Sequence, residues 1–252
     1  MAPMKNSLAL SSNEFVNEEV VSQNAYPAKY RGPEPIENQI KTIANIFNLF
    51  SPQAIKFANN LPELPEDAEG WFAIPTAEAL ARNYFSKVTD PAEKYCRAVN
   101  LILEKIAASR LFHNYREGQI VPQTLRIHVR TAEFIERLIE TQPGDILIIA
   151  AQLGMRHRGR SVRRAREVFT ANEFGLWSLV IGSIALTHPE RFTRIEELDI
   201  DCAGEEFSVD ADDQFDDAPL FCFGVGRLGF NTSFAGNASP DYGTASAFLP
   251  QA

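Results

Sequence analysis

A continuous hydrophobic run at residues 146–151 places the strongest constraint on the fold. Its sequence is Ile-Leu-Ile-Ile-Ala-Ala, and the turn-forming triplet Pro-Gly-Asp at 143–145 precedes it. A strand that is buried on both faces has such an uninterrupted apolar sequence, whereas a half-exposed strand alternates apolar and polar residues. We therefore expect a buried strand here, in a sheet that is flanked by helices.

Helical patterns occur on both sides of this strand. Apolar residues three and four positions apart predict a helix that starts at Ile36 and extends to about Phe50, and the pair Ser-Pro at 51–52 predicts the start of a second, short helix. The segment Asp-Pro-Ala-Glu at 90–93 is a strong helix start, and we expect its helix to run to about Phe112. These helices supply apolar faces that can cover the sheet.

Other segments have strand or buried-helix patterns. Residues 71–74 predict an edge strand, residues 125–129 a strand that is followed by a helix, and residues 195–200 another short strand. A continuous helix is the alternative for the second of these segments. Two apolar runs around Gly-Val-Gly-Arg within 220–230 predict a β-hairpin, and the uncharged run 174–186 predicts a central buried helix.

Taken together, these elements predict a mixed α/β fold. We expect a small, mostly buried sheet flanked by helices, with a C-terminal β-hairpin and a helical N-terminal appendage. The polar, weakly periodic residues 1–35 predict a disordered leader. Residues 36–70 form the helical appendage and linker in this scheme, and residues 71–252 form the main α/β domain.

The sequence predicts a cytoplasmic protein without a membrane partner. The longest uncharged apolar run, 174–186, is shorter than a bilayer span, and the apolar stretch near the N-terminus is too short for a signal-peptide core. The three cysteines have no close spacing of the kind that zinc or redox motifs require. The sequence matches no cofactor-binding motif, so the cofactor, if the protein has one, is unknown at this level.

The charge distribution suggests a local anion-binding site. Six arginines lie within residues 156–166, although the formal net charge of the chain is -9. The segment links the expected strand to a helix that Ser161 would cap, and positive charge in the first turn of a helix is unfavourable without a nearby anion. We predict a phosphate-bearing ligand, a nucleotide or a nucleic acid. The predicted anion-binding residues are Arg156, His157, Arg158, Arg160, Arg163 and Arg164.

Two alternatives remain open at the level of sequence. Residues 205–217, which we expect to form a solvated acidic loop, carry seven acids that can pair with the arginines in a structural or protein-interaction protein. We expect the N-terminal helices to pack on the main domain, and docking of a protein partner is the alternative. A metal-dependent phosphoryl-group enzyme is the second alternative. In it His157 acts as general base, and acids of residues 205–217 bind the metal. The histidines and cysteines match no metal-binding pattern, so the sequence identifies neither metal ligands nor catalytic residues.

Overall fold

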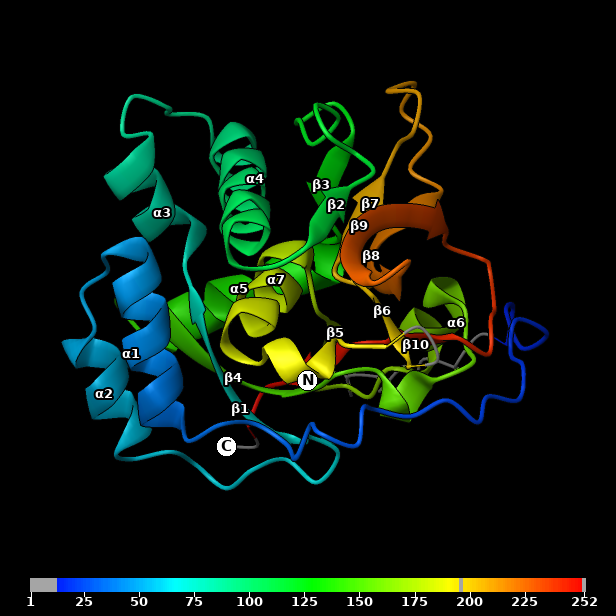
Figure 1. Cartoon of the computed structure of the whole chain (residues 1–252), viewed down its shortest axis with the longest axis horizontal. Helices are drawn as coiled ribbons and strands as arrows, with labels where there is room; N and C mark the ends of the chain where they lie inside the picture. The colour runs from blue at the N-terminus through cyan, green and yellow to red at the C-terminus, as the bar shows by residue number, and fades with distance from the viewer. Residues whose placement is uncertain (1–12, 195–196, 251–252) are drawn as a thin grey trace, which may run out of the picture.

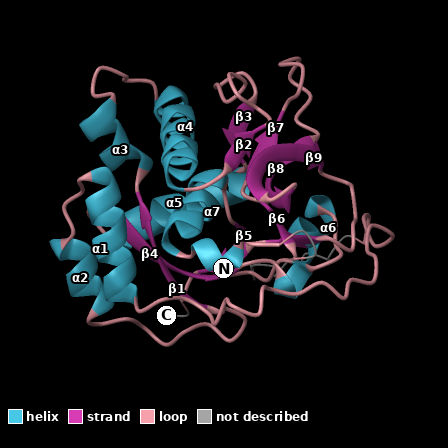
Figure 2. Ribbon diagram, viewed as in Figure 1, coloured by secondary structure: helices cyan, strands magenta, loops and turns pink. Residues whose placement is uncertain are grey.

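The computed structural model describes residues 13–194 and 197–250 and has the mixed α/β fold that the sequence predicts (Figures 1 and 2). The helices of the described part are α1 (Ile36–Phe47), α2 (Pro52–Ala58), α3 (Ala77–Tyr84), α4 (Pro91–Ser109), α5 (Val129–Thr141), α6 (Val162–Val168) and α7 (Ser178–Thr187). The strands are β1 (Gly70–Pro75), β2 (Phe112–Asn114), β3 (Leu125–Ile127), β4 (Ile146–Gln152), β5 (Glu173–Gly175), β6 (Asp199–Asp201), β7 (Glu205–Phe207), β8 (Asp217–Gly224), β9 (Arg227–Phe234), β10 (Tyr242–Thr244) and β11 (Ser246–Phe248).

The first sheet contains the predicted buried strand. Its order is β1-β4-β11-β5, and each neighbouring pair is antiparallel. Every residue of β4 is buried, as its uninterrupted apolar sequence predicts, and β1 forms the expected edge. Because β11 comes from the C-terminal end of the chain, this sheet joins segments that are far apart in the sequence.

The second sheet contains the predicted hairpin. Strands β8 and β9 pair over eight residues each and turn at Val225 and Gly226, which both have positive φ angles. Around them lie β6, β10, β7, β3 and β2, and this sheet occupies the upper right of Figure 2. The strand predicted at 195–200 is β6, and its expected first residue Ile195 lies outside the described residues.

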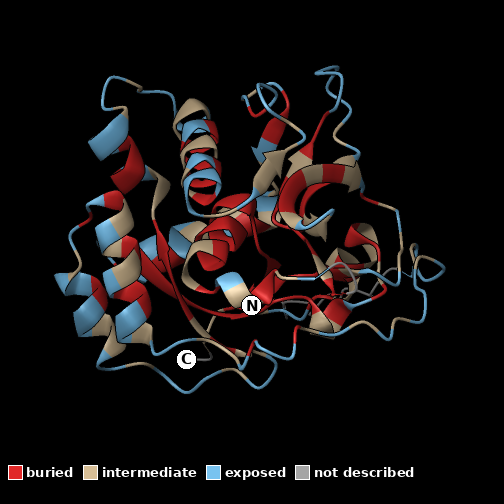
Figure 3. Ribbon diagram, viewed as in Figure 1, coloured by how far each residue is buried: buried red, intermediate tan, exposed pale blue. Residues whose placement is uncertain are grey.

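Helix α7 forms the centre of the hydrophobic core between the sheets. All of its residues from Ser178 to Ala185 are buried, and Figure 3 shows this helix and β4 in the colour of buried residues. The predicted central helix at 174–186 is therefore only partly correct. Residues 173–175 form β5 instead, because their extended backbone pairs with β11 and completes the first sheet.

The predicted N-terminal helices pack on the main domain. Ile40, Ile43 and Phe47 of α1 are fully buried and share one core with β1, β4 and α7. Helix α1 ends at Phe47 rather than Phe50, because Asn48 adopts a left-handed conformation with φ 51°. The buried face of α1 is thus already covered by the chain itself.

Two helix starts have the predicted capping geometry. The carboxylate of Asp90 accepts a hydrogen bond from the backbone N–H of Glu93 at 2.8 Å, and α4 ends at Ser109 because residues 112–114 form β2. The hydroxyl of Ser161 accepts a hydrogen bond from the N–H of Arg164 at 3.0 Å. No helix in the described part of the chain is long and apolar enough to span a membrane.

The expected acidic loop at 205–217 is wrong at its start. Glu205 is fully buried in β7, where its carboxylate accepts hydrogen bonds from the N–H of Ser178 at 2.7 Å and from the hydroxyl of Tyr95. Burial raises the pKa of Glu205 to about 7. These buried donors, which sequence spacing does not reveal, draw this acid into the core.

Candidate anion-binding site

The arginine-rich segment, residues 156–166, links β4 to α6 as the sequence predicts, and its last three arginines lie within α6. Its chain path depends on two glycines with positive φ angles, Gly154 at 118° and Gly159 at 76°. A side chain at Gly154 would come within 2.8 Å of the carbonyl oxygen of Gly243, and one at Gly159 would overlap the carbonyl oxygen of Val20. Both glycines thus let a distant backbone segment approach this connection closely.

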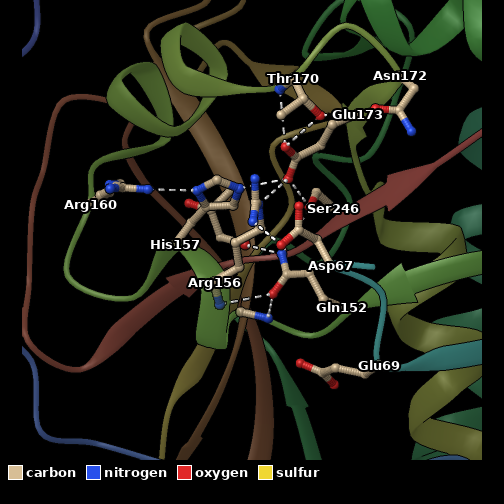
Figure 4. A network of polar contacts seen from close by, with 12 residues as sticks. Asp67, Glu69, Gln152, Arg156, His157, Arg160, Thr170, Asn172, Glu173 and Ser246 are labelled. Carbon is tan, nitrogen blue, oxygen red and sulfur yellow. Dashed lines mark hydrogen bonds and ion pairs between the residues drawn. The ribbon is translucent and has the colours of Figure 1, made fainter. Parts of the chain in front are cut away.

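His157 and Glu173 form the buried centre of the segment (Figure 4). His157 Nε2 lies 2.7 Å from Glu173 Oε1, and Nδ1 lies 3.0 Å from Arg160 Nη1. Because a guanidinium only donates, Nδ1 accepts and Nε2 carries the proton that binds Glu173. Burial lowers the pKa of His157, so the ring is neutral.

Glu173 is charged despite its burial. Burial alone would raise its pKa, but His157, the Ser246 hydroxyl at 2.6 Å and the Thr170 N–H at 3.1 Å together lower it to about 2. Arg156 Nε lies 3.3 Å from the same carboxylate. The neutral His157 and the anionic Glu173 therefore fix the start of the arginine-rich segment.

Arg156 turns away from the other arginines and pairs with acids of the domain itself. Its Nη1 contacts the carboxylate of Asp67, and its Nε lies near the carboxylate of Glu173 (Figure 4). A pocket of about 840 Å³ beside this pair is lined by residues 63–67, residues 170–172 and Phe248. Three of the lining residues are acids, so this pocket repels phosphate and does not extend the predicted anion site.

Arg163 binds Glu18 in the segment that precedes α1. Its Nη2 contacts Glu18 Oε1, its Nε lies 3.3 Å from Oε2, and the Ser161 hydroxyl donates to Oε2 at 2.6 Å. The Arg163 guanidinium also lies 4.7 Å above the ring of Phe15. One carboxylate thus receives a forked contact from arginine and a hydrogen bond from serine.

Glu19 binds the two neighbouring arginines. Its Oε1 lies 2.5 Å from Arg164 Nε and 3.4 Å from Arg160 Nε, and Arg164 also contacts Glu167 at 2.8 Å. The hydrogen bond from Arg164 is the largest cause of a lowered pKa at Glu19. The Arg160 and Arg164 side chains are 30% and 12% exposed, and the Glu19 side chain is 33% exposed, so these contacts lie at the protein surface.

Backbone hydrogen bonds place the two glutamates in register with the arginines. Val20 N–H donates to the carbonyl of Gly159 at 2.8 Å, and Ser161 N–H donates to the carbonyl of Glu18 at 3.0 Å. Glu19 and Arg160 thereby form an isolated antiparallel bridge. Residues 13–24, which belong to the expected disordered leader, lie against the arginines: residues 14–17 form a turn, and residues 20–24 follow without regular secondary structure, whereas residues 1–12 lie outside the described residues.

The two remaining arginines of the segment, Arg158 and Arg166, differ in exposure. Arg158 is exposed, and it donates to the carbonyl of Asn24 at 3.2 Å. Arg166 donates to the carbonyls of Ala203 and Glu205 at 2.9 and 2.6 Å, and it lies 3.8 Å from Glu206. All six arginines therefore have partners within the chain.

The acids that pair with the arginines differ from those expected. Of the seven acids in 205–217, only Glu206 forms an ion pair with the cluster among the described residues. The main partners are acids from other segments: Glu18, Glu19, Asp67, Glu167 and Glu173. Sequence reasoning missed them, although the adjacent pair Glu18-Glu19 and the lone acid Glu173 before an apolar run were visible signals.

The predicted site residues divide into two groups. Arg156 and His157 belong to the buried network with Glu173, and both ring nitrogens of His157 are engaged in hydrogen bonds. Arg158, Arg160, Arg163 and Arg164 face residues 13–24 at the surface, and we call these four side chains the arginine surface. Within the described residues, no three or more His, Cys, Asp or Glu side chains are grouped to hold a metal ion.

Comparison with known proteins gives no relative. The chain matches no protein-family model, and neither the curated proteins nor the solved structures contain a match.

Proposed function

We propose that this protein binds a phosphate-bearing ligand, such as a nucleotide or a nucleic acid, through the arginine surface. One observation carries the proposal: the arginine surface already holds two adjacent carboxylates, those of Glu18 and Glu19, in a surface segment. Carboxylate and phosphate both accept forked, charge-assisted hydrogen bonds from guanidinium groups. A surface that binds the first anion has the donors to bind the second.

Exposure distinguishes the arginine surface from His157 but not from Arg156. The side chains of Arg163, Arg160 and Arg164 are 36%, 30% and 12% exposed, whereas Arg156 is 27% exposed and His157 is almost completely buried. A ligand can therefore reach the arginine surface without unfolding the domain. Arg156 and His157, which were also predicted to bind the anion, are assigned to the fold in this proposal.

The alternative function is a structural or protein-interaction role, in which the arginines serve the fold alone. The observation that favours it is that every arginine in 156–166 has an intramolecular partner. Exposed ion pairs of this kind each contribute only about 0–1 kcal/mol to stability. The two functions therefore differ in what happens when the arginines are removed: the proposal expects lost binding, and the alternative expects a weakened fold.

Fluorescence anisotropy distinguishes them. Labelled single- and double-stranded DNA and RNA are titrated with the wild type and with Arg158→Ala/Arg163→Ala/Arg164→Ala, at salt concentrations from ~50 to ~200 mM. We expect salt-dependent binding by the wild type, with a slope of log K against log salt near -3 for about three to four phosphate contacts. The variant should lose this binding with its melting temperature nearly unchanged.

The matched control removes three exposed arginines elsewhere, in Arg82→Ala/Arg97→Ala/Arg137→Ala, and changes the net charge equally. It should bind like the wild type. An equal loss in the control would overturn the proposal, as would absence of binding at low salt by both the wild type and Glu18→Gln/Glu19→Gln. A lowered melting temperature of the first variant without any binding by the wild type would favour the structural alternative.

A further inference from the structure

Residues 13–24, which we call the strap, contact the arginine surface mainly through charges and backbone hydrogen bonds. Their aliphatic side chains stay in solvent: Val16 is 47% exposed, Val20 is 42% exposed and Val21 is 87% exposed. In Figure 1 the chain between the strap and α1 runs along the lower edge of the molecule. Little hydrophobic burial therefore holds the strap in place.

The chain immediately after the strap is anchored much more firmly. Tyr26 donates its hydroxyl hydrogen to Glu69 and accepts a hydrogen bond from the N–H of Met155 at 3.1 Å. The guanidinium of Arg191, which is buried, lies 4.2 Å above the Tyr26 ring, and Tyr30 is only 8% exposed. Tyr26 and Tyr30 thus hold the chain to the domain just beyond the end of the strap.

Release of the strap would uncover the donors of the proposed ligand site. Glu18 and Glu19 occupy Arg160, Arg163 and Arg164, and the carbonyl of Asn24 occupies Arg158. An incoming phosphate would need the same guanidinium groups, so strap and ligand exclude each other at these atoms.

We propose that the strap is an autoinhibitory segment whose Glu18 and Glu19 compete with a phosphate-bearing ligand for the arginine surface. This inference rests on the proposed function. In the closed state the strap covers the arginine surface, and in the open state it has left it. Exposed ion pairs contribute little stability and are screened by salt, so the closed state is favoured by only a small free-energy difference. The apparent affinity for ligand is then reduced by the fraction of molecules in which the strap is open.

The test compares three full-length proteins in the same anisotropy assay with labelled single-stranded DNA. Glu18→Gln/Glu19→Gln removes both competing charges, and we expect its affinity to rise by about tenfold over the wild type. The control Glu63→Gln/Glu66→Gln makes the same change in net charge at two exposed acids outside the strap. Its affinity should rise far less than that of the strap variant, because only long-range repulsion is reduced.

Hydrogen exchange on the wild type supplies a second readout that needs no variant. The N–H groups of Val20 and Ser161 form the hydrogen bonds that join the strap to residues 159–161. Saturation with the DNA should accelerate hydrogen exchange at both groups, because the strap then leaves the surface. Unchanged or stronger protection of these groups in the complex would overturn the inference.

The outcomes separate the two proposals. Equal affinities for the wild type and both glutamine variants, with binding still lost in the arginine variant, would overturn autoinhibition and leave the proposed function standing. Equal gains in the strap variant and the control would also overturn autoinhibition, because net charge would then explain the effect. Absence of binding by all proteins at low salt would overturn the proposed function and this inference together.

Discussion

Replacement of Glu173 by glutamine is the most informative test of the buried network. The carboxylate is fully buried, accepts hydrogen bonds from His157, Ser246 and Thr170, and lies 3.3 Å from Arg156 Nε. Its pKa falls from 4.5 to about 2 in the folded protein. A decrease of that size corresponds to at most about 3 kcal/mol of stabilisation by the ionised form at neutral pH, where His157 is neutral and contributes its hydrogen bond but no charge.

The stabilisation that Glu173 provides depends on pH. Because the folded-state pKa of Glu173 is depressed, its contribution is present above about pH 4.5 and is lost as the pH falls through about 2. Glu173→Gln should lower the free energy of unfolding by about 2–3 kcal/mol at neutral pH, and by roughly 1 kcal/mol near pH 3. Urea denaturation at both pH values measures the two differences directly.

The control for this experiment is Glu133→Gln, which neutralises an exposed acid on α5. We expect a change within about 0.5 kcal/mol at either pH. A loss below about 1 kcal/mol for Glu173→Gln at neutral pH, or an equal loss at both pH values, would refute the assignment of Glu173 as a charged anchor of the arginine-rich segment.

Two further predictions concern the core. Asp201 is buried beside Asp199, and burial raises its pKa to about 8, so the wild type should lose stability as the pH rises from about 4 to about 8. Asp201→Asn removes the part of this loss that Asp201 causes, while Asp199, whose pKa burial raises to about 7, still contributes. The variant should be roughly 1–3 kcal/mol more stable than the wild type near pH 9, as thermal melts would measure; an equal difference near pH 5 would contradict this cause. A side chain at Gly182 in α7 would overlap the Cγ2 atom of Ile102 in α4. Gly182→Ala should therefore destabilise the protein by about 1–3 kcal/mol in urea denaturation, although alanine favours helix, and a stabilised variant would show that the two helices can separate.

Local sequence determined much of the fold. The short, isoleucine-rich apolar run at 146–151 specified the buried strand β4, because a strand covered on both faces needs no polar side chain. Asp90 and Ser161 specified helix starts through short side-chain-to-backbone bonds, which depend on residues only three positions apart. The turn at Val225 and Gly226 likewise specified the β8–β9 hairpin.

Longer segments were harder to assign where tertiary pairing competed with local pattern. The run 174–186 has the composition of a buried helix throughout, yet its start became β5 because β11 offers an antiparallel partner there. Glu205 looked like part of a solvated acidic loop, yet Tyr95 and Ser178 provide donors that bury it. None of these three partners is close in the sequence to the residues that it contacts.

The arginine-rich segment shows the same division between what local sequence determines and what tertiary structure determines. The sequence alone determined that positive charge concentrates in the connection from β4 to α6 and in α6 itself, and that it needs anions nearby. Only the tertiary structure decided which anions these are, because it brings Glu18 and Glu19 to the surface arginines and Glu173 to the buried His157. Ion pairing depends on distances of a few ångströms between residues that the chain separates widely, and such distances are set by the packing of the whole domain.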